Sequence, residues 1–470
     1  MTIRLHDTLT GEVRPFAPID GTRARIYSCG PTVYGPAHIG NFRSFLFADL
    51  LVRHLRWRGV EVTWVMNVTD IDDKIIRGAA AAGTSVDEVA SRYLARFLED
   101  ADSLRMTRPD VLPRATEHID DIVALISTLL ERGHAYRTDD GSIFFRIGSW
   151  PAYGKLARLD PDSLRVGERV EADEYAKDDV RDFALWKGPK PGEPTWDTPI
   201  GPGRPGWHIE CSAMSMRHLG PSFDIHTGGV DLVFPHHEDE IAQSEAATGR
   251  PFVATWLHCA HLQMAGSKMA KSAGNIARVR ELLDGGLSPR ALRYALIAVH
   301  YRASINYSDE SLAAAAAAVE RLDALVAALT AYREQRPDDG DLPALLADAR
   351  EAFGAELDDD LGISPALAVL FDLVRELNRR IDARLLSTED AGRALGLLRD
   401  LDRVLGVLPD VRDEIDAESA ALLEARAAAR ASRDWAASDR LRDELAGRGI
   451  AVEDTRDGQR WRRLSESVHG

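Results

Sequence analysis

The chain has 470 residues, 45% of them hydrophobic, and 58 Lys and Arg against 75 Asp and Glu give it a formal net charge of −17. The length corresponds to about three globular domains, and the composition excludes both a disordered chain and a generally basic nucleic-acid coat. A polyanion, if one binds, must bind locally.

The three cysteines, Cys29, Cys211 and Cys259, exclude a disulfide framework and favour a reducing compartment. The N-terminal residues contain no basic segment leading into an apolar stretch, and no run of about 18 uncharged apolar residues occurs in the sequence. We therefore expect a cytoplasmic protein that does not enter a membrane.

The first part of the chain mixes β-type segments, helical patterns and Gly and Pro turns, which is typical of an α/β domain with a parallel sheet. Residues 24–27 are expected to form a first strand, followed by a turn that extends to residue 41. A long helix then follows, because apolar side chains recur at helical spacing: Phe45, Leu46, Leu50, Leu51 and Leu55.

A second strand is expected over residues 60–68 and ends in the polar segment 69–74. Hydroxyl and acidic side chains therefore stand at the carboxyl end of a strand, where open α/β sheets bind their ligands. Between about 113 and 206 we expect an insertion, with a helix at 119–131 and a hairpin turning at 140–141.

Beyond Tyr307 the composition shifts to Ala, Leu, Arg and Asp, with apolar residues at helical spacing. This pattern predicts an α-helical bundle that extends to about Val407, including a helical poly-Ala run at 313–318. A helix at 432–446, followed by β-type residues around a turn at 457–458, predicts a small mixed α/β domain at the end.

Two segments are suited to handling phosphate. The first, HIGN at 38–41, lies where a strand turns into a helix, so backbone amides and the positive helix end would face an anion, with Gly40 allowing close approach. The second, GSKMAKSAGN at 266–275, follows an expected strand at 256–262 and carries Lys268 and Lys271 in a loop that could follow developing negative charge. Each alone is compatible with a solvated turn or loop; their order and separation favour one nucleotide site.

A metal site is a further hypothesis. His236 and Glu240 are four residues apart on a helical pattern and would project from one face, and Cys29 and Cys211 could add two soft ligands. Two thiolates, an imidazole and a carboxylate form a plausible tetrahedral set for Zn²⁺. From spacing alone the nearby His226, His237 and Glu238 compete for these positions, whereas Cys259 is interpreted as a core thiol.

The two phosphate segments resemble the HIGH and KMSKS signatures of class I aminoacyl-tRNA synthetases. Four further segments and the ending WRR at 461–463 resemble the cysteinyl-tRNA synthetase family specifically, and the resemblance covers essentially the whole chain. These segments are CGPTVY at 29–34, NVTDIDDKII at 67–76, PGWHIECS at 205–212 and FPHHE at 234–238.

The resemblance implies a Rossmann-like catalytic domain at 1–308 with the insertion, a helical bundle on the tRNA stem side at 309–412 and an anticodon-binding domain at 413–470. It implies an ATP-dependent ligase that activates L-cysteine and transfers it to tRNA-Cys, with one Zn²⁺ that selects the thiol over serine. From the chemistry of the reaction we also expect Mg²⁺ to accompany ATP, and we expect the protein to be a monomer. The metal ligands would be Cys29, Cys211, His236 and Glu240.

Further roles are implied for matching residues. His38, Lys268 and Lys271 would be catalytic, and Gly40 and Asn41 would join them in binding ATP. Thr69, Trp207 and Asp231 would form the cysteine pocket, with Asp231 binding the substrate's ammonium group. The chain departs from the family at Asn41, where the signature has His, and at Ala270, where it has Ser.

Two alternatives remain open. A related ligase joins cysteine to the aminosugar of mycothiol, but that family lacks an anticodon-reading tail. A catalytically silent RNA-binding paralogue is the second alternative, and the intact lysines and metal-ligand candidates argue against it. The tail carries ten Arg against eight Asp and Glu between Glu424 and Arg463, together with Trp435 and Trp461, which suits contact with unpaired bases.

Overall fold

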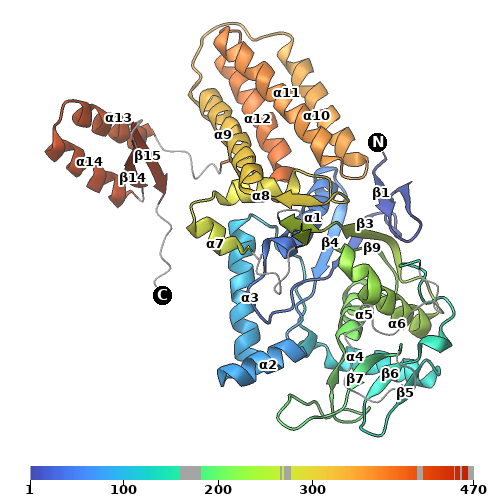
Figure 1. The fold of residues 1–470 in the computed structure, drawn as a ribbon. Helices are drawn as coiled ribbons and strands as arrows, with labels where there is room; N and C mark the ends of the chain where they lie inside the picture. Colours follow the sequence, from blue (N-terminus) through green and yellow to red (C-terminus); the bar gives the residue numbers. More distant parts are fainter. Residues whose placement is uncertain are drawn as a thin grey trace. The chain divides into compact units, whose positions relative to one another are not determined.

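A computed structural model describes residues 2–158, 181–264, 267–268, 277–409, 417–448, 450–455 and 458–463. The chain forms two compact units, Met1–Val407 and Leu408–Gly470 (Figure 1). None of the helices in the described ranges combines the length and the apolar character that crossing a lipid bilayer would require.

The centre of the first unit is a four-stranded parallel sheet with the strand order β10-β9-β3-β4. From β3 the chain passes through helix α1 (Ile39–Trp57) to β4 on one side, and it later returns to β9 on the other side of β3. The order of strands thus reverses at β3, and the carboxyl ends of β3 and β9 flank the point at which such sheets bind ligands. The strands are β3 (Arg23–Ser28), β4 (Glu61–Met66), β9 (Phe223–Gly229) and β10 (Val253–Cys259).

Helix α1 has the apolar face that the sequence predicts: Phe45, Leu46, Leu50, Leu51 and Leu55 are all buried. Strand β3, which was expected over residues 24–27, also forms and extends one residue further at each end. The second strand is shorter than the expected 60–68, because Met66 is the last residue that pairs with β3 and Val68 instead donates its amide to the carbonyl of Pro113.

The insertion contains a four-stranded antiparallel sheet with the order β5-β6-β7-β8. It has the expected helix and an expected hairpin, whose glycine, Gly141, adopts a φ of +84°. Its elements are α4 (Ile119–Glu131), β5 (Ala135–Arg137), β6 (Ile143–Phe145), β7 (Phe183–Lys187) and β8 (Arg204–Pro205).

Further elements surround the central sheet. Two helices, α5 (Trp207–Leu219) and α6 (Glu238–Thr248), lead into and out of β9. The others are the hairpin β1 (Arg4–Asp7) and β2 (Glu12–Pro15), helices α2 (Asp73–Ala82), α3 (Val86–Ser103), α7 (Val279–Asp284) and α8 (Pro289–Ile297), and the short turns Ala115–Glu117, Ile147–Ser149, Val230–Leu232 and Val233–His237.

The expectation of one strand over 256–262 is wrong. Strand β10 ends at Cys259, and a separate strand, β11 (Leu262–Met264), pairs with β12 (Ser267–Lys268) and β13 (Ile305–Tyr307) in another sheet. The chain leaves the central sheet here because the amide of Ala260 donates to the carbonyl of Tyr301 rather than to a neighbouring strand of that sheet.

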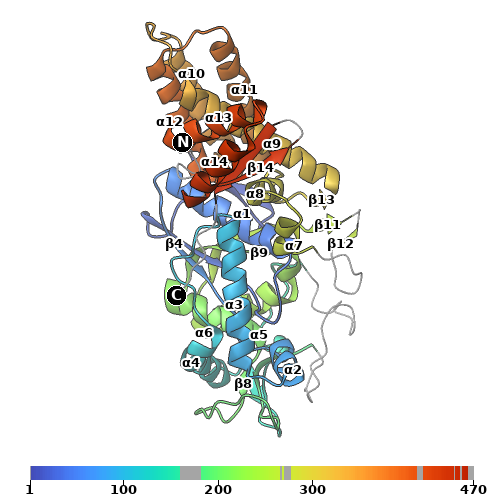
Figure 2. The same ribbon diagram turned by 90° about the vertical axis from the view of Figure 1, so that its left-hand side faces the viewer.

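Four helices form the bundle, which lies at the opposite end of this unit from the insertion (Figures 1 and 2). The poly-Ala run is helical as predicted and lies in the first of them. The helices are α9 (Asp309–Ala331), α10 (Leu342–Asp358), α11 (Ile363–Asp382) and α12 (Thr388–Leu405).

The described residues of the second unit form two helices and an antiparallel hairpin around a small core of Leu423, Leu445 and Ile450. Its second helix begins at Trp435 rather than at the expected residue 432, because the side chain of Asp434 accepts a hydrogen bond from the amide of Ala437 and caps the helix. The elements are α13 (Ala417–Ala431), α14 (Trp435–Gly447), β14 (Ile450–Thr455) and β15 (Gly458–Arg463).

Candidate active site and metal centre

The four residues expected to bind a metal come together at the carboxyl end of the central sheet. Cys29 follows β3, Cys211 lies in α5, His236 lies in the turn before α6 and Glu240 lies in its first turn. Their ligand atoms all lie within 4.8 Å of one another. The sulfur atoms of Cys29 and Cys211 are 4.0 Å apart, and His236 Nε2 lies 3.1 Å from Glu240 Oε1. This cluster is consistent with a metal site.

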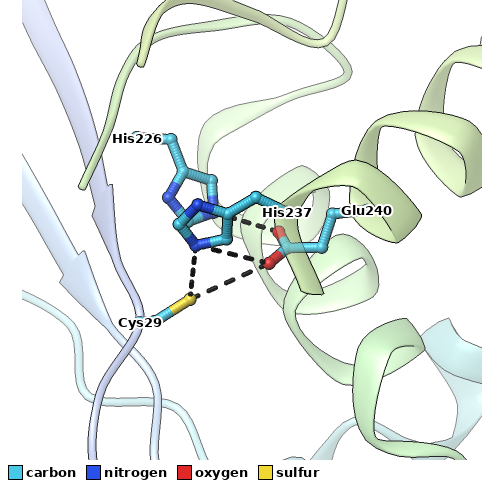
Figure 3. A group of neighbouring side chains, drawn as sticks. All are labelled: Cys29, His226, His237 and Glu240. Atoms are coloured by element: carbon cyan, nitrogen blue, oxygen red, sulfur yellow. Dashed lines mark hydrogen bonds and ion pairs between the residues drawn. The ribbon is translucent and has the colours of Figure 1, made fainter. Parts of the chain in front are cut away.

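A second set of ligand-type side chains overlaps the first and shares Cys29 and Glu240 with it. It adds His226 from β9 and His237 from the turn before α6 (Figure 3). His237 Nε2 lies 3.3 Å from Cys29 Sγ, and His226 Nε2 lies 3.0 Å from Glu240 Oε2. The sequence did not decide between His236 and His237, and in the folded chain each of them belongs to a possible ligand set with Cys29 and Glu240.

Two histidines that the sequence analysis did not single out orient these ligands. His208 Nδ1 lies 2.9 Å from His236 Nδ1, and His258 Nε2 lies 2.8 Å from His237 Nδ1. A hydrogen bond to the second ring nitrogen sets which nitrogen of a ligand histidine faces the metal. In the sequence, the one signal for this role of His208 is its position three residues before Cys211, whereas His258 has no comparable signal.

Burial controls the charge of this cluster. It raises the pKa of Cys29 and of Glu240 well above their ordinary values, and it lowers the pKa of His236 and His237 well below theirs. It also lowers the pKa of His226 to about 3. Burial alone therefore favours the neutral form of these five groups, whereas a divalent cation among them would favour thiolate and carboxylate.

The three residues expected to bind cysteine have different surroundings. Trp207, 39% exposed at the start of α5, stacks on His236 with ring centroids 4.3 Å apart. Thr69 is buried, and its amide donates to the carbonyl of Pro31, close to the Cys29 segment. Asp231 lies in the short turn after β9, with Oδ1 4.0 Å from His261 Nδ1. Among the described interactions of these three residues, the contact with a metal-ligand candidate is the stacking of Trp207 on His236.

His38 and Asn41 cap helix α1. The amide of Asn41 donates to His38 Nδ1 over 3.1 Å, and the amide of His38 donates to Asn41 Oδ1 over 3.1 Å. A side-chain carbon at Gly40 would lie 3.0 Å from His38 Nδ1, so glycine leaves room for this arrangement. The sequence analysis assigned both side chains to ATP and did not predict the cap.

The two phosphate segments approach each other at one end of the lysine loop. The amide of Ile39 donates to the carbonyl of Ala277, and His38 pairs with Arg278 in an isolated β-bridge. Ser267 and Lys268 form β12. Lys271, with residues 266 and 269–275 of this segment, lies outside the described residues.

Comparisons with known families match three segments. A family described as tRNA synthetases class I (C) catalytic domain matches residues 15–317, the DALR domain matches 352–409, and the cysteinyl-tRNA ligase anticodon binding domain matches 412–462.

The chain is also similar to whole proteins. It is 47% identical to the cysteine–tRNA ligase of Solibacter usitatus and 48% identical to that of Alkalilimnicola ehrlichii, over 98% of this chain and 100% of each relative. Among solved structures, a methionyl-tRNA synthetase of Mycobacterium tuberculosis bound by methionyl-adenylate superposes with a TM-score of 0.60 at 16% identity, over 89% of this chain and 96% of that one.

The parallel sheet with its ligand cluster at the switch point, together with the catalytic-domain match, defines a class I aminoacyl-tRNA synthetase, and hence an enzyme. At the identities above, over nearly the whole chain, the assignment is more specific. The chain belongs to the cysteine–tRNA ligase family. The family implies tRNA-Cys, ATP and cysteine as its partners.

Proposed function

We propose that Cys29, Cys211, His236 and Glu240 hold one Zn²⁺ and that this ion selects the thiol of cysteine over the hydroxyl of serine. The observation that carries the proposal is the spacing of the four ligand atoms. Around a tetrahedral zinc, two sulfurs lie about 3.8 Å apart and two N or O ligands about 3.3 Å apart. The pairs in the cluster, at 4.0 Å and 3.1 Å, fit these values.

When bound, zinc would supply a Lewis acid that favours the thiolate of the substrate, a ligand that a serine hydroxyl cannot replace. A pocket that distinguishes isosteres by shape alone reaches roughly 10- to 200-fold selectivity, whereas one built on a specific polar contact reaches about 10⁴-fold or more. A separate editing domain would then be unnecessary. Trp207 packs beside the ion, Thr69 contributes to the pocket, and Asp231 binds the ammonium group.

We further propose that the residues around His38 position ATP, which Mg²⁺ accompanies, for in-line attack of the cysteine carboxylate on the α-phosphate. The attacking group is already ionised, so positioning and charge neutralisation matter more than a general base. His38, Gly40 and Asn41 at the start of α1 contact the phosphates, and Lys268 and Lys271 stabilise the charge that develops. The β-bridge between His38 and Arg278 supports one shared site.

For the whole chain we propose a cytoplasmic monomer with catalysis in 1–308, including the insertion at about 113–206, tRNA stem contacts in 309–412 and anticodon contacts in 413–470. The exposed indoles of Trp435 and Trp461 support the last assignment, since both offer stacking planes for unpaired bases. The guanidinium of Arg430 lies 5.4 Å from the ring centre of Trp435.

The ligand set is tested by measuring the metal content of purified His236→Gln and His237→Gln, each with cysteine-dependent pyrophosphate exchange. If His236 is the ligand, His236→Gln loses zinc and activity, and the matched His237→Gln keeps its zinc. The opposite pattern would assign the ion to the overlapping set of Cys29, His226, His237 and Glu240. Full zinc content in both variants would contradict the proposed ligation by either imidazole.

A further inference from the structure

Three buried side chains beside the cluster form a hydrogen-bonded chain. Asn67 follows β4, Thr69 stands two residues later, and Glu210 lies in α5 next to Cys211; they are 2%, 2% and 1% exposed. Asn67 Nδ2 donates to Thr69 Oγ1 over 3.3 Å, and Thr69 Oγ1 donates to Glu210 Oε2 over 3.0 Å. Neither Asn67 nor Glu210 has a role in the function proposed above.

The direction of these hydrogen bonds follows from the first partner of Asn67. The backbone amide of Gly30 can only donate, and it donates to Asn67 Oδ1 over 2.9 Å. The Asn67 side chain must therefore turn its NH₂ group toward Thr69. A hydroxyl has one hydrogen and two lone pairs, so Thr69 accepts from Asn67 and sends its hydrogen to Glu210. One lone pair of Thr69 is left for another donor.

We infer that Asn67 and Glu210 are positioning residues that hold the Thr69 hydroxyl as a hydrogen-bond acceptor for the α-ammonium group of cysteine. The inference rests on the proposed placement of cysteine at Thr69. An ammonium group carries three donors and no acceptor, so a hydroxyl whose own hydrogen is already committed is complementary to it.

The hydrogen-bonded side chains of Asn67, Thr69 and Glu210 also connect the Thr69 hydroxyl to the metal-ligand candidates. A side-chain carbon at Gly30 would lie 1.8 Å from the carbonyl oxygen of Asn67, so only glycine lets the segment after Cys29 approach this closely. At the other end, Glu210 and Cys211 are neighbours on one helix. These hydrogen bonds thereby fix the position of the Thr69 hydroxyl relative to Cys29 and Cys211. The site therefore binds the thiol and the ammonium group of cysteine in one fixed geometry.

The test compares two ligands that differ in the ammonium group, using the full-length, metal-loaded protein. One is cysteine, measured by its KM in pyrophosphate exchange; the other is 3-mercaptopropionate, measured by its competitive Ki. Glu210→Met leaves the Thr69 hydrogen without an acceptor and should raise the KM for cysteine about tenfold, with the Ki changed less than about twofold. Glu210→Gln, whose amide oxygen can still accept, should restore the wild-type KM.

Thr69→Val provides a second, isosteric variant that removes the hydroxyl itself. It should show the same selective loss, and combining it with Glu210→Met should add nothing further, because both variants remove one interaction. A parallel weakening of both ligands, or additive losses, would show a merely structural role and overturn the inference. Wild-type protein without cysteine-dependent exchange would instead contradict the proposed function, and the inference with it.

Discussion

The indole of Trp207 stacks on the imidazole of His236, with ring centroids 4.3 Å apart and 22° between the ring planes. Trp207 is the first residue of α5 and stands four positions before Cys211. Helix α5 therefore carries both the ligand candidate Cys211 and the indole that stacks on the ligand candidate His236. Since Trp207 is partly exposed, it forms a boundary between solvent and the buried cluster.

Trp207→Ala should raise the KM for cysteine in pyrophosphate exchange, because the cover over the cluster is lost. Aromatic pairs contribute about 0.5–1.5 kcal/mol beyond burial, which corresponds to a roughly 2- to 10-fold change. Trp207→Phe keeps a stacking ring and should lie close to wild type. An unchanged KM for cysteine in Trp207→Ala would remove Trp207 from the pocket.

Asn41→Asp should separate helix capping from ATP binding. The carboxylate can still accept from the amide of His38, so the thermal unfolding midpoint should stay near that of wild type. A new negative charge close to the phosphates costs up to about 4 kcal/mol at an effective dielectric constant near 20, so the KM for ATP should rise more than tenfold.

The matched variant Asn41→Ala loses the hydrogen bond from the amide of His38 to Asn41 Oδ1, at a cost of up to about 1 kcal/mol in stability, without adding charge, while the amide of residue 41 still donates to His38 Nδ1. Its KM for ATP should therefore rise less than that of Asn41→Asp. Equal KM values for ATP in the two variants would place Asn41 away from the phosphates.

Arg293→Met should be strongly destabilising. Arg293 is fully buried, donates to Asp49 Oδ2 over 2.7 Å and to the carbonyl of Leu405 over 2.6 Å, and so joins α8, α1 and the end of α12. Removing one partner of a buried ion pair costs about 3–5 kcal/mol. Arg53→Met, in which the lost partner of Asp49 is partly exposed, should cost clearly less. Urea unfolding followed by circular dichroism measures both, and equal losses would contradict this account.

Asp73→Asn should lower stability in a pH-dependent manner. Burial would raise the pKa of Asp73, but hydrogen bonds and charge from Lys187 and Arg204 outweigh it and lower the pKa to about 2. A depressed pKa stabilises the fold above the unfolded-state value near 4, and this stabilisation is lost as the pH falls from about 4 to 2.

Asp73 is 38% exposed, so after solvent screening the contribution is no more than about 1 kcal/mol. The thermal midpoints of wild type and Asp73→Asn should differ by a constant amount above pH 5 and converge below pH 4. A difference that grows toward low pH would contradict the ion-pair explanation.

Local periodicity predicted the helices well, because each apolar face repeats within one element, as along α1. The break between Cys259 and Leu262 was not predictable in this way, since it depends on a hydrogen bond to Tyr301, some forty residues away. The i, i+4 relation of His236 and Glu240 was likewise visible in the sequence, and the structure places both ligand atoms within reach of each other.

The partners of the ligand histidines were missed for the same physical reason. His258 lies in β10 opposite Gly228 of β9, and His237, from the turn before α6, packs over Gly228, where a side-chain carbon would meet its Cε1 at 2.7 Å; no local pattern encodes this arrangement. The set of Cys29, Cys211, His236 and Glu240 was a hypothesis from residue types that the family resemblance strengthened, and the overlapping set with His226 and His237 shows that spacing alone could not choose among the imidazoles.

The central claim, that a metal in this cluster selects the thiol, is tested most directly by kcat/KM for cysteine and for serine in pyrophosphate exchange, before and after complete removal of zinc. We predict that removal lowers the value for cysteine to about that for serine and that added Zn²⁺ restores the difference. Selectivity for cysteine that survives complete zinc removal would contradict the claim.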